Sequence, residues 1–237
     1  MSAIRVVFLD DGGVLNDNDR RAPEWRRLLG EFFAPRYGGT PEAWGEANAA
    51  VFGGIWDDWW TALAAGTEPG PDWWPLQDHR WLTGMFDRVG VPWPADIQGT
   101  TDAARAHVMR HIDCAYPDAA GAVRAMRARG LTVHTASGGL SSELAAYLER
   151  MGIRDLFDRL YGPDLIGVHK SSARYYERIA EDSGTDPHDA VVVDDSPKVL
   201  EWAEATGFRA VHMDRGGSGS RFTRITSLEQ LIPLLNR

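Results

Sequence analysis

Apolar and polar positions follow two different patterns along this chain. Residues 4–9 form a short apolar run closed by Asp10-Asp11-Gly12-Gly13, which is typical of a buried strand that ends in a tight loop. From about residue 117 onward, similar runs alternate with amphipathic stretches. We predict strands at 131–136, 160–161, 190–193 and 208–213, and helices at 117–129, 140–151, 172–180, 197–206 and from a capping box at 227–230 onward. This alternation predicts an α/β fold, a doubly wound parallel sheet covered by helices on both faces.

The stretch from residue 17 to residue 111 has a different character, because it holds nine of the ten tryptophans and no β-branched run. Helices are expected over 25–33, 44–59, 80–89 and 103–112, with a Pro-, Gly- and Trp-rich loop at 67–75. We therefore expect an all-helical cap domain at 17–111, inserted into a core domain formed by 1–16 and 112–237. Most of the tryptophans should form the core of the cap, and some could line a pocket.

The composition excludes several classes of protein. With 34 acidic and 25 basic residues the net charge is −9, so no nucleic-acid partner is expected. No apolar run is long enough to span a bilayer and no signal-peptide pattern is present, so no membrane partner is expected. The only cysteine, Cys114, forms no internal disulfide, which favours a cytoplasmic location. The chain has no Cys/His cluster for zinc and no signal for an oligomeric state.

Chemically useful residues lie next to the predicted strands, at the edge where open α/β sheets bind ligands. Asp10 follows the first strand, Ser137-Gly138 the second and Asp194-Asp195 the fourth, while Lys170, one of only two lysines, precedes a helix. Carboxylates this close repel one another unless a cation lies among them, and Mg²⁺ prefers hard oxygen ligands. The set predicts metal-assisted phosphoryl transfer.

Each of these residues also has a purely structural interpretation. Asp10-Asp11-Gly12-Gly13 has the composition of a turn, and Asp194-Asp195-Ser196-Pro197 that of a helix N-terminus. Ser137 could begin the next helix, and Lys170 could be a solvated surface residue. Any one segment is a weak signal, and the ordered set is a strong one.

In order and spacing, the four segments resemble those of the haloacid dehalogenase-like hydrolase superfamily, and in particular its phosphatases with a helical cap. The matching segments are Phe8-Leu9-Asp10-Asp11-Gly12-Gly13-Val14-Leu15, His134-Thr135-Ala136-Ser137, Lys170 followed by Tyr176, and Val191-Val192-Val193-Asp194-Asp195-Ser196. The resemblance implies that Asp10 is the nucleophile and forms an aspartyl-phosphate.

The same resemblance implies a cofactor and a substrate class. Mg²⁺ would be held by Asp10, the Gly12 carbonyl and Asp195, assisted by Asp194. The phosphoryl oxygens would be held by Ser137, Gly138 and Lys170. The substrate would be a small phosphorylated metabolite, over which the cap opens and closes.

One position departs from the phosphatases of the family. They usually carry a second Asp two residues after the nucleophile, which protonates the leaving group, and here that position is Gly12. Asp11 is a poor substitute, because adjacent residues that leave a strand point to opposite faces. A register with Asp11 as the nucleophile stays open, but Asp10 places Gly13-Val14-Leu15 where the family has its Gly-Thr/Val-Leu.

Three functions therefore remain open. The preferred one is a phosphatase in which water or a cap residue supplies the proton, or whose substrate has a good leaving group. The others are a catalytically weak or inactive binding protein with the same fold, and a metal-independent haloacid dehalogenase, against which Asp194-Asp195 argues. Phosphonate-cleaving relatives need a cap lysine, and no lysine precedes Lys170.

Overall fold

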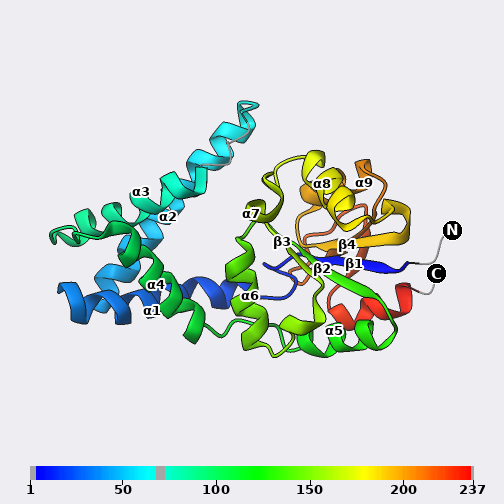
Figure 1. Ribbon diagram of the computed structural model, residues 1–237, viewed down its shortest axis with the longest axis horizontal. Helices are drawn as coiled ribbons and strands as arrows, with labels where there is room; N and C mark the ends of the chain where they lie inside the picture. The colour runs from blue at the N-terminus through cyan, green and yellow to red at the C-terminus, as the bar shows by residue number, and fades with distance from the viewer. Residues whose placement is uncertain (1–3, 68–72, 236–237) are drawn as a thin grey trace. The chain divides into compact units, whose positions relative to one another are not determined.

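The structure is a computed structural model that describes residues 4–67 and 73–235 (Figure 1). It divides into two compact units, which we call the core unit (Met1–Asn18 with Cys114–Arg237) and the helical unit (Asp19–Asp113).

The core unit is built on a six-stranded parallel sheet with the strand order β3-β2-β1-β4-β5-β6 (Figure 1). The strands are β1 (Val6–Leu9), β2 (Thr132–Ala136), β3 (Arg159–Tyr161), β4 (Ala190–Asp194), β5 (Arg209–Met213) and β6 (Thr223–Ile225). The strand order reverses beside β1, because β2 lies on one side of it and β4 on the other. Open α/β sheets bind ligands at such a point, outside the carboxyl ends of the strands.

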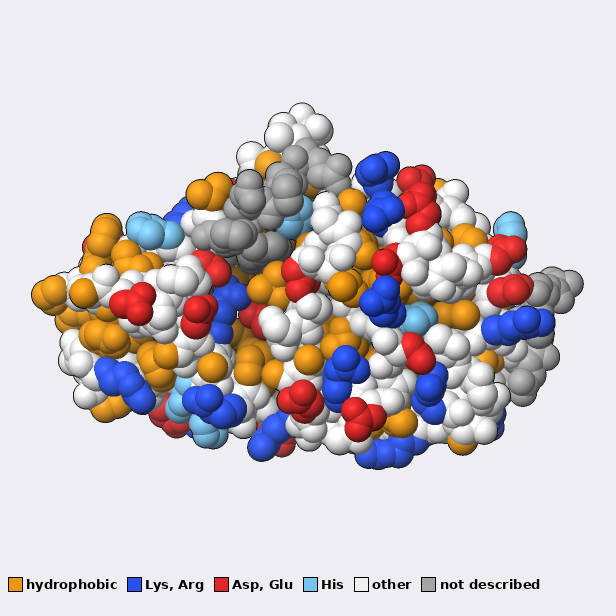
Figure 2. Space-filling view, in the orientation of Figure 1, with side chains coloured by type: hydrophobic (Ala, Val, Ile, Leu, Met, Phe, Trp, Pro, Cys, Tyr) orange, Lys and Arg blue, Asp and Glu red, His pale blue; other side chains and the backbone are white. Residues whose placement is uncertain are grey.

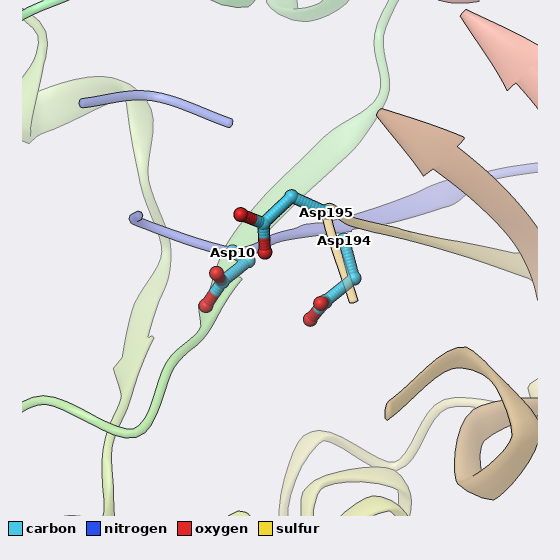
Figure 3. A group of neighbouring side chains, drawn as sticks. All are labelled: Asp10, Asp194 and Asp195. Carbon is cyan, nitrogen blue, oxygen red and sulfur yellow. The ribbon is translucent and has the colours of Figure 1, made fainter. Parts of the chain in front are cut away.

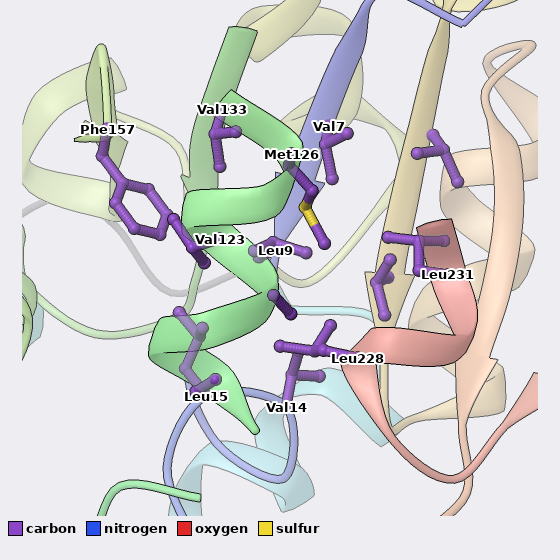
Figure 4. Packing of buried hydrophobic residues seen from close by; sticks show 14 of the residues in the cluster. Val7, Leu9, Val14, Leu15, Val123, Met126, Val133, Phe157, Leu228 and Leu231 are labelled. Atoms are coloured by element: carbon purple, nitrogen blue, oxygen red, sulfur yellow. The ribbon is translucent and has the colours of Figure 1, made fainter. Parts of the chain in front are cut away.

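Helices cover both faces of this sheet, and the alternation of side chains along β1 shows why its sequence is continuously apolar. Val7 and Leu9 pack on the face covered by α5 (Ala119–Ala128), α6 (Ser141–Arg150) and the 3₁₀ helix η3 (Leu228–Leu234), as Figure 4 shows for α5 and η3. Phe8 packs on the opposite face, with residues of α7 (Pro163–Ile166), α8 (Ala173–Ser183) and α9 (Pro197–Ala205). A strand buried on both faces needs apolar residues at every position. Two short 3₁₀ turns, η1 (Arg154–Leu156) and η2 (Pro187–Asp189), complete the connections.

The helical unit contains, in its described residues, α1 (Asn18–Tyr37), whose first residue Asn18 still belongs to the core unit, α2 (Pro41–Ala64), α3 (Trp73–Val89) and α4 (Ile97–His111). Its core contains packed aromatic side chains: the Phe33 and Trp44 rings are stacked with centres 4.7 Å apart, and Phe86 meets Trp44 edge to face at 4.8 Å. Trp44, Trp59 and Trp81 are buried, whereas Trp60 and Trp93 are half exposed.

The predicted fold class is confirmed, and several elements differ from the prediction. Helices α1 and α4 begin at Asn18 and Ile97, before the predicted residues 25 and 103, and the short helix α7 was not predicted. Helix α3 begins at Trp73, so residues 73–75 of the predicted loop are helical, and residues 68–72 lie outside the described residues. Pro75 falls in the first turn of α3, where its missing N–H costs no helical hydrogen bond. The capping box opens a 3₁₀ helix that contains Pro233, and Ser227 caps the Glu229 N–H. The short edge strand β6 was not predicted, since three residues are too few to show a period.

Two further features concern the apolar length of the helices and the distribution of charge on the surface. No helix among residues 4–67 and 73–235 is long and apolar enough to cross a membrane. On the face shown in Figure 2, Lys and Arg side chains are interspersed with Asp and Glu.

Candidate active site

The ends of β1 and β4 bring three carboxylates together. In the register of these two strands Leu9 lies opposite Val193, so Asp10 and Asp194 leave the sheet side by side, and the Asp10 N–H donates to the Val193 carbonyl at 3.0 Å. One carboxylate oxygen from each of Asp10, Asp194 and Asp195 lies within 4.8 Å of the others (Figure 3). The two far ends of the sequence therefore meet in one acidic cluster, which we define as these three residues.

Lys170 connects two members of the acidic cluster. Its Nζ lies 2.7 Å from Asp10 Oδ1 and 2.6 Å from Asp194 Oδ2, and it donates to the Ala136 carbonyl at 2.7 Å. The side chains of Lys170 and Asp194 are 7% and 2% exposed, so these ion pairs are shielded from water. An ammonium group has three donors, and Lys170 uses all of them to join the ends of β1, β2 and β4.

The charges of the cluster do not balance, because three carboxylates face one ammonium. Burial, together with the nearby Asp194 and Asp195, raises the pKa of Asp10 to about 8 although Lys170 opposes this. Burial and Asp194 likewise raise the pKa of Asp195 to about 6. Burial alone would lower the pKa of Lys170, but Asp10 and Asp194 outweigh it and hold that pKa well above its ordinary value.

This donor set fits a hard divalent cation. Its ligand atoms are carboxylate oxygens, and a cation among them would offset the burial and the mutual repulsion that raise the two carboxyl pKa values. The Gly12 carbonyl, two residues after Asp10, is the expected backbone ligand.

The loop after β1 shows which of the tandem aspartates belongs to the cluster. The Asp11 carboxylate accepts a hydrogen bond from the Asn16 side chain at 2.6 Å, and the Asp11 carbonyl accepts from the N–H groups of Leu15 and Asn16. Asp11 therefore stabilises the loop by hydrogen bonds within it, whereas Asp10 lies beside Asp194 and contacts Lys170.

Ser137 and Gly138 lie at the end of β2, beside β1. Ser137 is buried, its Oγ accepts from the Gly139 N–H at 3.1 Å, and its carbonyl accepts from the Tyr175 hydroxyl at 3.0 Å. Gly138 has open space where a Cβ would be. The structure thus places both residues at the carboxyl edge of the sheet, one strand away from Asp10.

Arg215 is a residue that the sequence analysis missed. It donates to the carbonyls of Gly13 at 3.3 Å and Val14 at 3.1 Å, and it contacts both carboxylate oxygens of Asp118 at 3.0 Å. Its guanidinium also lies 3.7 Å from the centre of the Tyr116 ring. Arg215 thereby holds the outer side of the loop that carries Asp10. Arg215 follows β5 by two positions, so the expectation that functional residues come directly after the strands could have identified it.

Comparison with known proteins places these features in a family. A family model described as haloacid dehalogenase-like hydrolase matches residues 4–207. A phosphatase of Mycobacterium tuberculosis is 33% identical over 103 residues, covering 43% of this chain and 48% of the relative. An enolase-phosphatase of Bradyrhizobium is 34% identical over 121 residues (49% and 52%), and an (S)-2-haloacid dehalogenase of Burkholderia cepacia is 27% identical over 127 residues (51% and 55%). The matches thus span about half the length of these curated relatives.

Solved structures share the fold over the whole chain. A defluorinating L-2-haloacid dehalogenase gives a TM-score of 0.73 at 19% identity, covering 100% of this chain and 99% of that one. The Bacillus subtilis HAD-hydrolase YfnB, bound to magnesium, gives 0.71 at 15% identity, covering 100% of both chains. At these identities the likeness concerns the fold alone.

Proposed function

This chain belongs to the haloacid dehalogenase-like hydrolases, and from that premise we propose that it is a Mg²⁺-dependent phosphatase of small phosphorylated metabolites that works through an aspartyl-phosphate on Asp10. The observation that carries the proposal is the acidic cluster with Lys170 inserted into it. A carboxylate attacks an anionic phosphate only where a cation and hydrogen-bond donors neutralise the charge of the phosphate. We propose a cytoplasmic location, since buried Cys114 needs no oxidising compartment.

The roles of the residues follow from their positions. Asp10, Asp194, Asp195 and the Gly12 carbonyl would hold Mg²⁺, which would screen the carboxylates from one another and neutralise charge on the phosphoryl group. Lys170 occupies one oxygen of Asp10, so the other oxygen is the one to attack phosphorus. Ser137 and the Gly138 N–H would donate to the phosphoryl oxygens, and the helical unit would select the substrate.

The test is hydrolysis of small phosphate esters with and without Mg²⁺, in the wild type and two isosteric variants. We expect Asp10→Asn to lose at least about a hundredfold in kcat, and Asp11→Asn to stay within about tenfold, because an asparagine oxygen can still accept from Asn16. Activity that survives in Asp10→Asn or in EDTA would remove the mechanism. Loss of activity in a folded Asp11→Asn alone would move the nucleophile to Asp11.

A haloacid dehalogenase is the second candidate, favoured by the absence of a carboxyl group at Gly12, since a halide leaves without a proton. The acidic cluster, whose carboxylate oxygens lie within 4.8 Å of one another, argues against a dehalogenase, because without a cation it would repel a carboxylate substrate. Halide release from a 2-haloacid in EDTA would establish it. A protein that binds but does not catalyse would give no turnover in either assay.

A further inference from the structure

The backbone at Gly12 does not require glycine. Its φ lies outside the left-handed region, unlike that of Gly13, so a residue with a side chain could stand there without backbone strain. The space next to it is filled by another side chain: a Cβ on Gly12 would lie 2.9 Å from Oδ1 and 3.1 Å from Nδ2 of Asn18. Both residues belong to the core unit. The loop that follows β1 and carries Asp10, which we call the nucleophile loop, thus has the exposed neutral amide of Asn18 beside it.

Several ionisable groups near Asp10 in the described part of the core unit are committed to other contacts, and Asp194 and Asp195 would hold the metal. Asp11 accepts from Asn16, and Lys170 donates to two carboxylates and a carbonyl. The Tyr175 hydroxyl donates to the carbonyls of Ser137 and Tyr161. Tyr176 has no exposed surface, so it cannot reach a substrate. Asn18 can donate a hydrogen bond through Nδ2, but an amide does not transfer a proton at neutral pH.

We propose that this site is specialised for phosphoryl donors whose leaving group is stable as an anion, such as acyl, enol or aryl phosphates, and that Asn18 orients the leaving oxygen without protonating it. The inference rests on the proposed phosphatase function and deepens it by naming the substrate class.

The chemistry balances without a general acid. In the first step a bond forms between an Asp10 oxygen and phosphorus while the bond from phosphorus to the leaving oxygen breaks, and the leaving group keeps the electron pair. In the second step water attacks the phosphorus, the bond to Asp10 breaks, Asp10 returns to a carboxylate, and the proton of water passes to solvent. A general acid contributes about 10²–10⁴ in rate. Without a carboxyl group at Gly12 to supply this proton, alkyl phosphates are penalised, because their alkoxide leaving groups need it, and donors with acidic leaving groups are spared.

The test is a series of aryl phosphates from dinitrophenyl to phenyl phosphate, with acetyl phosphate and glycerol phosphate at the two extremes, assayed with saturating Mg²⁺. The quantity compared is kcat/KM, which includes the step in which the leaving group departs. We expect kcat/KM to fall steeply with leaving-group pKa, and glycerol phosphate to be at least about 100-fold poorer than acetyl phosphate.

Variants of Gly12 and Asn18 test whether these two residues set the dependence of kcat/KM on leaving-group pKa. Gly12→Asp and Asn18→Asp each place a carboxyl group beside the loop and should flatten the slope, raising kcat/KM for glycerol phosphate at least about tenfold. Asn18→Ala should lower kcat/KM across the series without changing the slope. Gly121→Asp, a carboxyl group added to α5 where the structure has open space, is the control and should leave the slope unchanged. Asn18 is exposed, so Asn18→Asp tests the inference even where Gly12→Asp does not fold.

The outcomes distinguish a failure of the proposed leaving-group specificity from a failure of the proposed phosphatase function. A shallow slope in the wild type would mean that another residue supplies the proton, which overturns the inference and leaves the phosphatase in place. A steep slope that neither carboxyl variant flattens would overturn the role given to Asn18. No hydrolysis of any member of the series with Mg²⁺ would instead overturn the proposed function.

Discussion

Gly13 and Asp195 lie so close that a Cβ on Gly13 would overlap the Asp195 carboxylate. Gly13 also has a φ of 72°, in the left-handed region that side chains disfavour. Two separate demands thus require glycine here: the turn of the loop after β1, and the approach of that loop to the acidic residues after β4.

Replacement of Gly13 by alanine should therefore damage the site more than a strained turn alone would. The left-handed conformation costs an alanine about 1 kcal/mol of stability, and the clash with Asp195 adds loss of Mg²⁺ binding. Gly130→Ala is the matched control, because Gly130 has a φ of 78° and open space around it. Urea denaturation and Mg²⁺ titration would measure both effects. Equal behaviour of the two variants would contradict the contact with Asp195.

The two lysines allow a paired test of the cluster. Lys170→Met removes the only ammonium that contacts Asp10 and Asp194 in the described structure, and we expect at least about a hundredfold loss of kcat. Lys198→Met removes a lysine that is 68% exposed and should leave kcat within about twofold. Steady-state kinetics on one phosphate ester decides this. Comparable losses in both variants would argue that Lys170 acts only through general stability.

Binding of Mg²⁺ should depend on pH because protons compete for the same oxygens. Burial and neighbouring carboxylates raise the pKa of Asp10 to about 8 and that of Asp195 to about 6 in the metal-free protein. Affinity should therefore rise by up to about tenfold per pH unit between pH 6 and pH 8. Calorimetry in two buffers of different ionisation enthalpy would count the protons released. Affinity that is constant over this range would contradict the raised pKa values.

The raised pKa of Asp10 also makes the stability of the metal-free protein depend on pH. A carboxyl group whose pKa is higher in the folded than in the unfolded state destabilises the fold once it must ionise. The contribution of Asp10 to the stability of the metal-free protein should thus fall as pH rises from about 4 toward 8. Asp10→Asn should remove part of this loss, which thermal unfolding without metal would show.

Arg215 should matter more for stability than an exposed ion pair does. Arg215→Ala removes the donors to Gly13 and Val14 and leaves the Asp118 carboxylate, 13% exposed, without its ion-pair partner. We expect a loss of about 1–3 kcal/mol in the free energy of unfolding. The control Arg221→Ala breaks an ion pair with Glu204 whose side chains are 58% and 48% exposed, and it should cost clearly less stability than Arg215→Ala. Similar losses would show that Arg215 does not hold the nucleophile loop.

His134 should make the protein sensitive to acid. Its ring is buried and stacks on Phe8 at 5.0 Å, and burial lowers its pKa to about 4. As pH drops from 6.5 to 4, the unfolded chain binds a proton at His134 that the folded protein does not bind. The contribution of His134 to stability therefore falls by up to about 3 kcal/mol. His134→Leu should flatten this part of the pH dependence, whereas His188→Leu, at an exposed position, should not. Denaturant unfolding at pH 7 and pH 4.5 measures the difference, and parallel curves for wild type and His134→Leu would contradict it.

The sequence by itself determined the kinds of most elements and, for the longer strands of the core unit, the residues at their ends. Apolar runs such as 190–193 and helical spacing such as that of 197–206 are local patterns, and burial on one or both faces imposes them directly. The pairing of Asp10 with Asp194 also follows from the order of residues, because parallel strands finish at the same edge of a sheet. Gly130 and Gly152 likewise end helices in the structure with positive φ, as the sequence pattern indicates.

Only the tertiary structure decided which side chains touch. Arg215 meets the Gly13 carbonyl across 202 positions of sequence, and Lys170 meets Asp10 across 160. The Asn18 amide beside Gly12 and the commitment of Asp11 to Asn16 depend on how one loop folds back on itself. No local period encodes such contacts, since they result from the packing of the whole core unit. Periodicity reports which face of an element is buried, and only the folded chain fixes what that face meets.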